Sequence, residues 1–485
     1  MTKAQYESLQ LGKLKELAKA RGLKGISTLK KDALIQCMMD EDAREEKNNE
    51  PEQQVSADEK DTPQQPQASH TTQASTTNQG NGHNENGTAQ TYTKPVNDGD
   101  EHGKKDFDRL DSGEEVEGIL EVMSDGYGFI RSDNFLPGEN DVYVAPSQIR
   151  RFRLKTGDIL RGNTRVKSPT EKFSALLYVK MINNMAPAMS LKRMNFEDMT
   201  PIFPNKRINL ERRDGSTAMR IVDLVSPIGK GQRGMIVSPP KAGKTTLLKD
   251  AAKSILQNNP EMNLMILLID ERPEEVTDIK EAIQGPNVDV IYSTFDELPE
   301  HHKRVSEMAI ERAKRLVENK KDVVIFIDSI TRLARAYNQT VPPSGRTLSG
   351  GLDPAALHMP KRFFGAARNM REGGSLTILA TALVDTGSKM DDVVYEEFKG
   401  TGNMELVLDR RLQERRVFPA IDIAKSGTRK ENLLLSEEEM EAVTIMRKAL
   451  NGMKAEEATE NLLNMFAHTK TNKEVVATIR RQKFI

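Results

Sequence analysis

The sequence contains no tryptophan and a single cysteine, Cys37, among its 485 residues. One thiol cannot form a disulfide framework within the chain, and it cannot supply a cysteine-based metal site. Such sparing use of cysteine is typical of proteins in a reducing compartment, so we expect a cytoplasmic location. Any chemistry must come from other side chains.

The chain also lacks a net charge of either sign and any long apolar run. Its 71 basic and 72 acidic residues give a formal net charge of −1, so a nucleic-acid site would have to be a local feature. No apolar run reaches the length that spans a membrane, and the first residues, MTKAQYESLQ, lack the apolar core of a signal peptide. We therefore expect no membrane partner.

Residues 45–105 contain no Leu, Ile, Met or Phe, and Tyr92 is their only large aromatic residue. Such a segment cannot bury enough apolar surface to offset its chain entropy, so the composition predicts disorder. Its middle, QQPQASHTTQASTTNQGNGHNENG, resembles prion-like low-complexity sequence. Two interpretations follow, a flexible tether or a segment that self-associates, and the Pro, Gly and scattered charges favour the tether.

Five regions are predicted along the chain. Residues 1–44 read as a small helical subdomain, either a bundle with solvated lysines or a nucleic-acid contact, and 45–111 form the low-complexity linker. Residues 112–187 hold the strand-like runs EEVEGILEV, GYGFIR, DVYV and DILRGNTRV, whose number and spacing suit a small β-barrel. A connector, 188–219, leads to residues 220–485.

The last region alternates strands with helices. The runs MIVS, LMILLID, VDVIYST, VVIFID and SLTILATAL are apolar throughout, as expected for strands buried on both faces. Their alternation with helical stretches predicts an α/β domain with a mostly parallel sheet. The tail from 436 to 485 is helical and charged.

The stretch VSPPKAGKTTLL, residues 237–248, lies between a predicted strand and a predicted helix, which is the context that a phosphate-binding loop requires. Ala242 and Gly243 let the backbone fold around phosphates at the positive end of the helix dipole. Lys244 would reach the β- and γ-phosphates, and the Thr245 hydroxyl would bind Mg²⁺. The usual first glycine of the motif is Ser238 here.

Acidic residues end the next strands. Asp270 and Glu271 follow LMILLI, and Asp328 ends VVIFID. In open α/β sheets the ligand lies beyond the carboxyl ends of the strands, so these groups should face the phosphate loop. Asp328 fits the Mg²⁺ shell, and Glu271 fits a base that polarises the attacking water.

The charge that develops on the γ-phosphoryl group also needs an arginine. Candidates are Arg415, Arg416 and Arg429 in RRVFPAIDIAKSGTRKE, and spacing alone does not choose among them. An arginine supplied by a neighbouring subunit would imply a head-to-tail interface and hence a closed ring.

The motif DGYGFIR, residues 125–131, suggests what the ATPase drives. On a strand, Tyr127 and Phe129 share a face, and exposed aromatic residues on a small barrel are stacking platforms for unpaired bases. Tyr143 and Phe173 could extend the platform, and Arg131 could contact phosphate or stack. The alternative is that the aromatic residues fill the interior of the barrel.

Two loops of the α/β region suit a moving phosphate backbone. VPPSGRTLSGG, 341–351, carries Arg346, and DTGSKMDD, 385–392, carries Lys389. Both follow core strands, where a ring ATPase projects loops into its central hole. Ordinary surface turns are the alternative.

The chain carries a series of longer motifs, which are, in chain order, GYGFIR, PSQIRRFRLKTGD, SPIGKGQRG, SPPKAGKTTLL, LLIDERPEEVTD, FIDSITRLARAYN, KRFFGAARN and ATALVDTGSKMDDVVYEEFKGTGNMEL. In these motifs the chain resembles the Rho family of bacterial transcription termination factors. The resemblance covers about 112–485. It implies a cold-shock-like OB barrel and a RecA-like P-loop core in a homohexameric ring. The ring would bind pyrimidine-rich single-stranded RNA, hydrolyse ATP with Mg²⁺, translocate, and displace the transcript from the RNA polymerase elongation complex, with elongation factors as further partners.

The resemblance also assigns sites. It implies a catalytic Glu271, Asp328 beside Mg²⁺, Arg429 as an arginine finger in trans and Arg416 as a second interface arginine. The ATP-binding residues that it implies are Gly229, Lys230, Gly231, Gln232, Arg233, Gly234, Lys241, Ala242, Gly243, Lys244, Thr245, Thr246, Arg272 and Phe418. The RNA site that it implies on the barrel comprises Gly126, Tyr127, Gly128, Phe129, Ile130, Arg131, Asp141, Val142, Tyr143, Glu171, Lys172 and Phe173. The RNA site that it implies in the pore comprises Arg346, Thr347, Leu348, Ser349, Gly350, Gly351 and Lys389.

This sequence departs from the family pattern at four places. Residues 45–105 are additional, Phe173 stands where Tyr is frequent, Arg346 where Lys is common, and Ser238 where Ala is usual. No departure removes a catalytic group. The changes at 173 and 346 could alter RNA preference.

Two other functions remain open. A rotary or protein-export ATPase uses a similar core but couples to a shaft or membrane partner, and GYGFIR and the two loops argue against it. An RNA-binding scaffold with a vestigial ATP site would lack turnover, and the presence of Lys244, Thr245, Glu271 and Asp328 argues against it.

Overall fold

The structure is a computed structural model that describes Ala18, Lys31, Leu34, Ile35 and residues 109–132 and 134–481. Nearly all of the predicted helical subdomain and of the predicted linker, including Cys37, lies outside the described residues, so both stay predictions. The chain divides into two compact units, Met1–Thr93 and Lys94–Ile485, and the larger unit holds the barrel and the α/β domain.

A closed barrel forms the first part of this unit, with its strands in the order β1-β2-β3-β5-β4. Its elements are β1 (Asp111–Val122), β2 (Gly128–Arg131), β3 (Val142–Val144), α5 (Pro146–Phe152), β4 (Ile159–Arg165) and β5 (Ser174–Ile182). Closure leaves the barrel no free sheet edge. The predicted small barrel is confirmed, and all four predicted strand-like runs lie in it.

Aliphatic side chains fill the interior of the barrel. Its buried cluster comprises Leu120, Ile130, Val142, Val144, Ile149, Leu154, Leu160, Leu176 and Ile182. None of the four predicted platform aromatics belongs to this cluster of described residues. The alternative that they fill the interior is therefore wrong.

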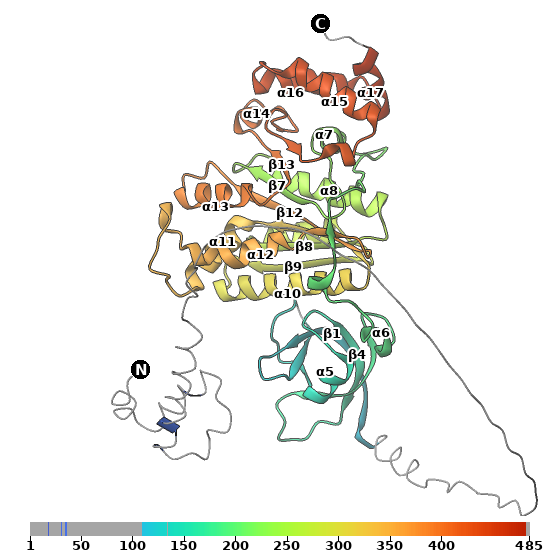
Figure 1. The fold of residues 1–485 in the computed structure, drawn as a ribbon, viewed down its shortest axis with the longest axis vertical. Coiled ribbons are helices and arrows are strands. Elements are labelled where there is room, and N and C mark those ends of the chain that lie inside the picture. Colours follow the sequence, from blue (N-terminus) through green and yellow to red (C-terminus); the bar gives the residue numbers. More distant parts are fainter. Residues whose placement is uncertain (1–17, 19–30, 32–33, 36–108, 133, 482–485) are drawn as a thin grey trace, which may run out of the picture. The chain divides into compact units, whose positions relative to one another are not determined.

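The second part is an α/β domain built on one large sheet, with the strand order β14-β13-β7-β12-β10-β8-β9 (Figure 1). Its strands are β6 (Pro201–Ile202), β7 (Arg233–Ser238), β8 (Asn263–Glu271), β9 (Val288–Thr294), β10 (Asp322–Asp328), β11 (Arg368–Met370), β12 (Ser375–Leu383), β13 (Met404–Val407) and β14 (Gly427–Thr428). The pairings from β13 across to β9 are all parallel. The prediction of a mostly parallel sheet is confirmed.

Helices cover both faces of this sheet (Figure 1). The helices of this domain are α7 (Thr217–Val225), α8 (Lys244–Asn258), α9 (Pro273–Ala282), α10 (Pro299–Glu318), α11 (Ile330–Thr340), α12 (His358–Gly365), α13 (Lys389–Lys399), α14 (Arg410–Glu414), α15 (Glu437–Leu450), α16 (Ala455–Ala467) and α17 (Asn472–Arg481), and the last four group beyond α7 rather than on the sheet. A short helix, α6 (Pro187–Ser190), lies in the connector, and short 3-10 turns complete the chain. The described part of the charged tail is helical, as predicted.

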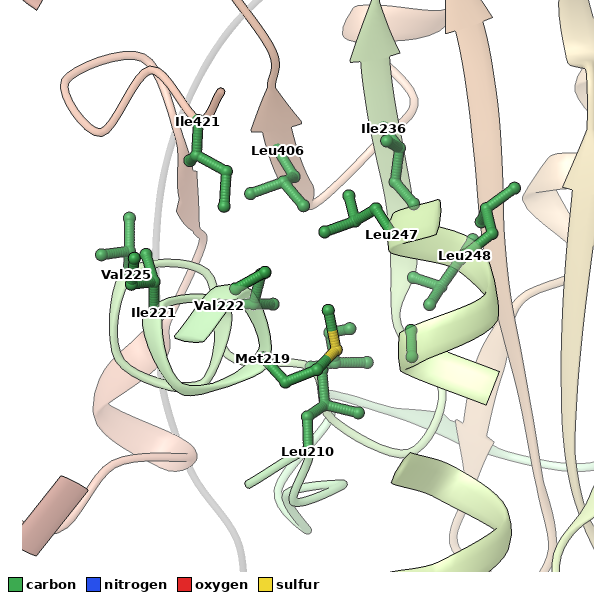
Figure 2. Packing of buried hydrophobic residues seen from close by; sticks show 14 of the residues in the cluster. Leu210, Met219, Ile221, Val222, Val225, Ile236, Leu247, Leu248, Leu406 and Ile421 are labelled. Carbon is green, nitrogen blue, oxygen red and sulfur yellow. The ribbon is translucent and has the colours of Figure 1, made fainter. Parts of the chain in front are cut away.

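Two hydrophobic cores lie on opposite faces of the sheet, because successive side chains of a strand point to opposite sides. On β7, Ile236 belongs to the core with α7 and α8, whereas Met235 and Val237 belong to the core with α10 and α11. Figure 2 shows the first core, where Met219 and Val222 of α7 and Leu247 of α8 lie close together. These contacts fix the start of α8, and hence the loop before it, against β7.

The barrel and the α/β domain meet at α10. Gly157 follows α5 with φ +93°, and a Cβ there would lie 2.5 Å from the carbonyl carbon of Glu311. Beside it, buried Asp158 pairs with Arg193, and Lys155 pairs with Glu318 at 3.0 Å. The barrel is thus anchored to the core by close backbone approach and by ion pairs.

We predict that Gly157→Ala destabilises the protein more than Gly113→Ala. Both glycines have positive φ, but nothing lies within 4 Å of a Cβ at Gly113. In both variants alanine in the left-handed backbone conformation lowers the free energy of unfolding by about 1–2 kcal/mol. At position 157 only, the clash with α10 lowers it by a further amount of about 1–3 kcal/mol. Denaturant unfolding curves measure the difference, and equal losses in the two variants would contradict the packing described at α10.

Candidate nucleotide and RNA sites

The phosphate loop lies at the carboxyl end of β7 and leads into the N-terminus of the long helix α8. Gly243 caps that helix with φ +88°, and Lys241 also has positive φ, +65°. This left-handed backbone turns the loop sharply over the end of the helix, where unpaired N–H groups and the helix dipole favour an anion. The predicted strand–loop–helix context is confirmed.

The structure brings together two of the predicted catalytic residues, Lys244 and Glu271, and the predicted Mg²⁺ residue Asp328. The Nζ of Lys244 lies 2.5 Å from Oδ1 of Asp328 and 3.2 Å from Oε1 of Glu271. Thr381 on β12 donates a hydrogen bond of 2.8 Å to the same Oδ1 of Asp328. β12 lies between β7, which leads into the phosphate loop, and β10, which ends at Asp328, so Thr381 lies beside Asp328.

Burial and charge together tune this cluster. Burial on its own lowers the pKa of Lys244, but the attraction of Asp328 and Glu271 outweighs it and raises the pKa above its usual value. Burial, reinforced by the negative charge of Asp328, raises the pKa of Glu271, and Lys244 and Arg332 partly offset that rise. A carboxylate whose pKa is raised is a better proton acceptor, which suits the role of a base.

A cavity of about 440 Å³ adjoins the phosphate loop. Its lining includes Ala242, Gly243 and Thr246 of the loop, Thr217 at the start of α7, and Phe418. The ring of Phe418 is half exposed, at 49%. The cavity therefore offers an anion-binding end and an aromatic side, which fits the phosphates and the base of a nucleotide.

The other predicted ATP-binding segment, residues 229–234, lies at the opposite end of β7. Lys230 pairs with Asp322 at the start of β10, at 2.6 Å, and Arg233 donates to the carbonyl oxygens of Thr401 and Ala367. Gln232 is buried and bonds Asn403. Within one chain these residues lie away from the phosphate loop, because the length of β7 separates the two segments. Their role in ATP binding stays a prediction.

Arg429 also lies at that opposite edge, directly after β14, where its backbone N–H donates to Asn403. Its side chain is exposed, and it is close enough to Arg233 for its charge to contribute, after burial, to lowering the pKa of Arg233. Arg429 cannot reach the phosphate loop of its own chain from the far edge of the sheet. A role toward a neighbouring chain remains open to it.

Three further arginines, which the sequence analysis gives as candidates for the ATP site, are exposed. Arg415 and Arg416 follow α14 close to Phe418, and Arg272 caps α9 with 67% of its side chain exposed. Arg272 borders a second cavity, of about 470 Å³, with Asp270 and Arg332 rather than the cavity beside Phe418.

The predicted aromatic platform forms on the barrel. The ring centroid of Phe129 lies 5.8 Å from Tyr127, 6.0 Å from Tyr143 and 5.2 Å from Phe173. All four rings are partly exposed, and Lys172 places its Nζ 5.1 Å from the ring of Phe173. Tyr127 precedes β2 rather than lying on it, so the turn, and not strand alternation, places it beside Phe129.

Arg131 does not have the exposed position that a phosphate contact requires. Its side chain is 5% exposed and pairs with Asp141, which is itself 2% exposed, and with Glu121 at 2.7 Å. Its guanidinium lies 4.9 Å from the centroid of the Phe129 ring. In this conformation Arg131 and Asp141 pair with each other inside the barrel wall, so neither presents a free charge at the surface. Their place in the RNA site stays a prediction.

The remaining predicted residues of the barrel site have supporting positions. Glu171 pairs with Arg165 and accepts a hydrogen bond from the backbone N–H of Ser168, which closes the loop before Lys172. Gly128 lies against the backbone of Glu121, where a Cβ would clash at 2.8 Å. Gly126 has positive φ in the turn before Tyr127.

The two predicted pore loops contact each other. A Cβ at Gly350 would lie 2.5 Å from the backbone N of Met390, so the loop 341–351 presses against the start of α13. Arg346 and Lys389 are both exposed. Buried Asp391 on α13 accepts hydrogen bonds from Arg335 of α11, at 2.8 and 2.7 Å, and from Thr386.

Comparison with known proteins decides the family. The chain is 56% identical over 378 residues to transcription termination factor Rho of Pseudomonas aeruginosa, covering 76% of this chain and 90% of that protein. It is 58% identical to the Borreliella burgdorferi protein of that name over 75% and 70% of the two chains, and 55% identical to that of Escherichia coli over 76% and 89%.

The chain belongs to the Rho family of transcription termination factors. The family model described as Rho termination factor, RNA-binding domain, matches residues 116–188, which form the barrel. The model described as ATP synthase alpha/beta family, nucleotide-binding domain, matches residues 218–428, which hold the phosphate loop. The chain is therefore a termination factor with an RNA-binding domain and an ATP-hydrolysing domain.

A solved ATPase of the type III secretion system of pathogenic bacteria has a similar fold, with a TM-score of 0.50 and 20% identity. The match covers 66% of this chain and 94% of that one. At this identity the likeness concerns the fold alone. Among the described residues no helix is long and apolar enough to cross a membrane.

Sequence reasoning missed two residues of the catalytic cluster. Thr381 lies in the apolar run SLTILATAL and was not named as a site residue. A hydroxyl buried in such a strand needs a hydrogen-bond partner, and that requirement could have pointed to a polar neighbour. Arg332 lies four residues after Asp328, one turn into α11, and its Nη1 is 3.5 Å from Oε2 of Glu271. No local spacing pointed to this contact, because Arg332 lies on α11 and Glu271 on β8.

We predict that Arg332→Gln moves the acid limb of ATP hydrolysis to higher pH. Glu271 must be ionised to act as a base, and its pKa already lies above the ordinary 4.5. Activity therefore falls as the pH drops through that pKa, and removing a nearby cation raises the pKa further. The profile of kcat against pH, measured from pH 5 to 9, reports the shift; an unchanged or acid-shifted limb would contradict the assignment of Glu271 as the base.

Proposed function

We propose that this protein is an RNA-dependent, ATP-driven translocase that moves along single-stranded RNA and displaces the transcript from RNA polymerase. The observation that carries the proposal is the gathering of Lys244, Glu271 and Asp328 at one sheet edge. The same compact unit carries a partly exposed aromatic platform on its RNA-binding barrel. A hydrolysis site and a base-stacking surface in one rigid unit suit a motor better than a passive binder.

The chemistry would proceed at the carboxyl edge of the sheet. Lys244 would leave its carboxylate partners to bind the β- and γ-phosphates, while Phe418 would stack on the adenine. Glu271 would then accept a hydrogen bond from the attacking water, because its raised pKa suits proton acceptance. Pyrimidine-rich RNA would stack its bases on Phe129 and its neighbours, since every base has an aromatic face.

Mg²⁺ would be held by Asp328 and by the Thr245 hydroxyl. Among the described residues no group of three or more His, Cys, Asp or Glu could hold a metal ion by itself. That fits Mg²⁺, which usually takes only one or two carboxylates and completes its shell with phosphates and water. When bound, the ion would neutralise charge that develops on the phosphates.

A homohexameric ring is the assembly that the arrangement of the sites supports. Arg429 and residues 229–234 lie at the sheet edge opposite the phosphate loop. A head-to-tail contact would therefore bring Arg429 of one subunit toward the nucleotide of the next, with Arg416 as a second interface arginine. The loops that carry Arg346 and Lys389 would then face the central hole and hold RNA.

Three further proposals rest on the sequence. The regions are bounded at 1–44, 45–111, 112–187, 188–219 and 220–485, with the second serving as a tether. The protein would work in the cytoplasm, as its single cysteine favours. Elongation factors would join RNA polymerase among its partners.

We predict that Glu271→Gln lowers RNA-dependent ATP turnover by at least about 10²-fold while leaving the affinity of the barrel for RNA unchanged. The amide keeps the size of the side chain but cannot accept a proton. Turnover is measured by phosphate release, and RNA affinity by fluorescence anisotropy with a short pyrimidine-rich RNA.

Phe129→Ala should have the opposite effect to Glu271→Gln, weakening RNA binding rather than turnover. It removes the central ring of the platform and should weaken RNA binding by about 1–3 kcal/mol, while hydrolysis recovers at high RNA concentration. Full turnover in Glu271→Gln would refute the catalytic assignment. Tight RNA binding by the wild type without any turnover would instead favour the scaffold.

A further inference from the structure

The carboxylate of Glu121 is shared between the barrel and the α/β domain. On the barrel side it pairs with Arg131, whose Nε and Nη2 lie 2.8 and 2.7 Å from Oε2. On the core side it pairs with Arg304 of α10, whose Nη2 lies 2.8 Å from Oε1 and 2.7 Å from Oε2. The side chain of Glu121 is 16% exposed, and those of Arg131 and Arg304 are 5% and 34% exposed, so the pair with Arg131 is shielded from solvent and the pair with Arg304 is only partly shielded.

This shared carboxylate lies directly behind the RNA platform. The guanidinium of Arg131 is 4.9 Å from the centroid of the Phe129 ring, and Phe129 contacts the other three platform rings. A base that stacks on this ring changes the surroundings of the guanidinium, whose position is tied to Glu121. The barrel side of the ion pair is therefore sensitive to occupation of the platform.

On the core side, α10 leads toward the hydrolysis site. Glu307, one turn after Arg304, accepts a hydrogen bond of 2.7 Å from the Tyr337 hydroxyl on α11. α11 also carries Arg332, which lies 3.5 Å from Glu271. Two packed helices thus connect Arg304 with the catalytic base.

Other contacts between the two domains do not involve the platform. Asn134 bonds Tyr292, Lys155 pairs with Glu318, and Arg312 bonds Asn183. The pair of Glu121 and Arg304 differs from these contacts, because Glu121 also binds Arg131. Among the described residues it is the one hydrogen-bonded contact between barrel and core that shares a carboxylate with Arg131. Both residues border a cavity of about 810 Å³ between the domains, which leaves room for the pair to rearrange.

We propose that Arg304, acting through Glu121, is a positioning residue that transmits occupation of the barrel platform to the hydrolysis site. The proposal rests on the proposed RNA-dependent hydrolysis and names the contact that couples its two halves. Arg304 touches neither RNA nor nucleotide. It holds α10, and through it α11, in the arrangement that RNA on the platform favours.

The test compares Arg304→Gln, Arg304→Lys and the wild type in the full-length protein. Arg304→Gln should bind a short pyrimidine-rich RNA within about two-fold of wild type, because Arg131, Glu121 and the platform remain. Its RNA-stimulated kcat for ATP should fall by about five-fold or more, whereas hydrolysis without RNA should not change. Arg304→Lys keeps one charged contact to Glu121 and should restore part of the stimulation.

Lys180→Gln is the matched control. It removes a cation from an exposed ion pair of the same barrel, with Glu115 at 2.8 Å, that does not touch the core. It should behave as the wild type in both assays. Adding Glu121→Gln to Arg304→Gln should cause less further loss of stimulation than Glu121→Gln causes by itself, since the contact between Glu121 and Arg304 is already broken and only the pair with Arg131 is lost in addition.

Full stimulation in Arg304→Gln would overturn the proposal, and so would a loss of RNA affinity as large as the loss of stimulation. Unfolding curves of all variants show whether any loss is global; if Arg304→Gln is destabilised, Arg304→Met, which keeps the length of the side chain and leaves the pair of Glu121 with Arg131 in place, replaces it in the same comparison. Absence of RNA stimulation in the wild type would instead refute the proposed function on which this inference rests.

Discussion

The buried contact of Lys244 with Asp328 and Glu271 is the interaction on which the other features depend. These side chains start on three different elements, α8, β10 and β8, and they meet because parallel strands place their carboxyl ends at one edge of the sheet. A cation and two carboxylates removed from water are costly unless they satisfy one another. The same arrangement keeps Lys244 charged and raises the pKa of Glu271, so the geometry and the protonation states have one cause.

A second constraint is the close attachment of the RNA-binding barrel to the ATPase core. Gly157 lets the barrel backbone approach α10, and Asp158, Arg193 and Glu318 form a buried ionic cluster beside it. A barrel on a flexible linker could capture RNA but could not report its presence to the sheet. Because the attachment is close and largely shielded from water, a small change at the platform has a mechanical route to α10 and α11.

Much of this could be predicted from the sequence, because the signals were local. The phosphate loop, the five apolar strands and the aromatic motif each depend on a short stretch whose meaning changes little with context. What could not be predicted depends on pairing across long separations. Arg131 looked like a free cation beside Phe129, but Asp141 and Glu121 neutralise it inside the barrel wall.

The same limit applies to the ATP-binding segments. Residues 229–234 precede the phosphate loop by only a few positions, yet the length of β7 lies between them, and the sequence did not show that the two segments lie at opposite ends of that strand. The contact of Thr381 with Asp328 was missed for the opposite reason, because the two residues are far apart in the sequence and adjacent in the sheet. β13 and β14 were missed because strands of that length leave little periodic signal.

The central claim is that the phosphate loop and the barrel form one coupled machine. The most direct measurement is ATP hydrolysis by the purified full-length protein with and without pyrimidine-rich single-stranded RNA. The account predicts slow hydrolysis without RNA and a strong increase with it. Hydrolysis at the same rate in both conditions would contradict the coupling, and the two domains would then have to be explained separately.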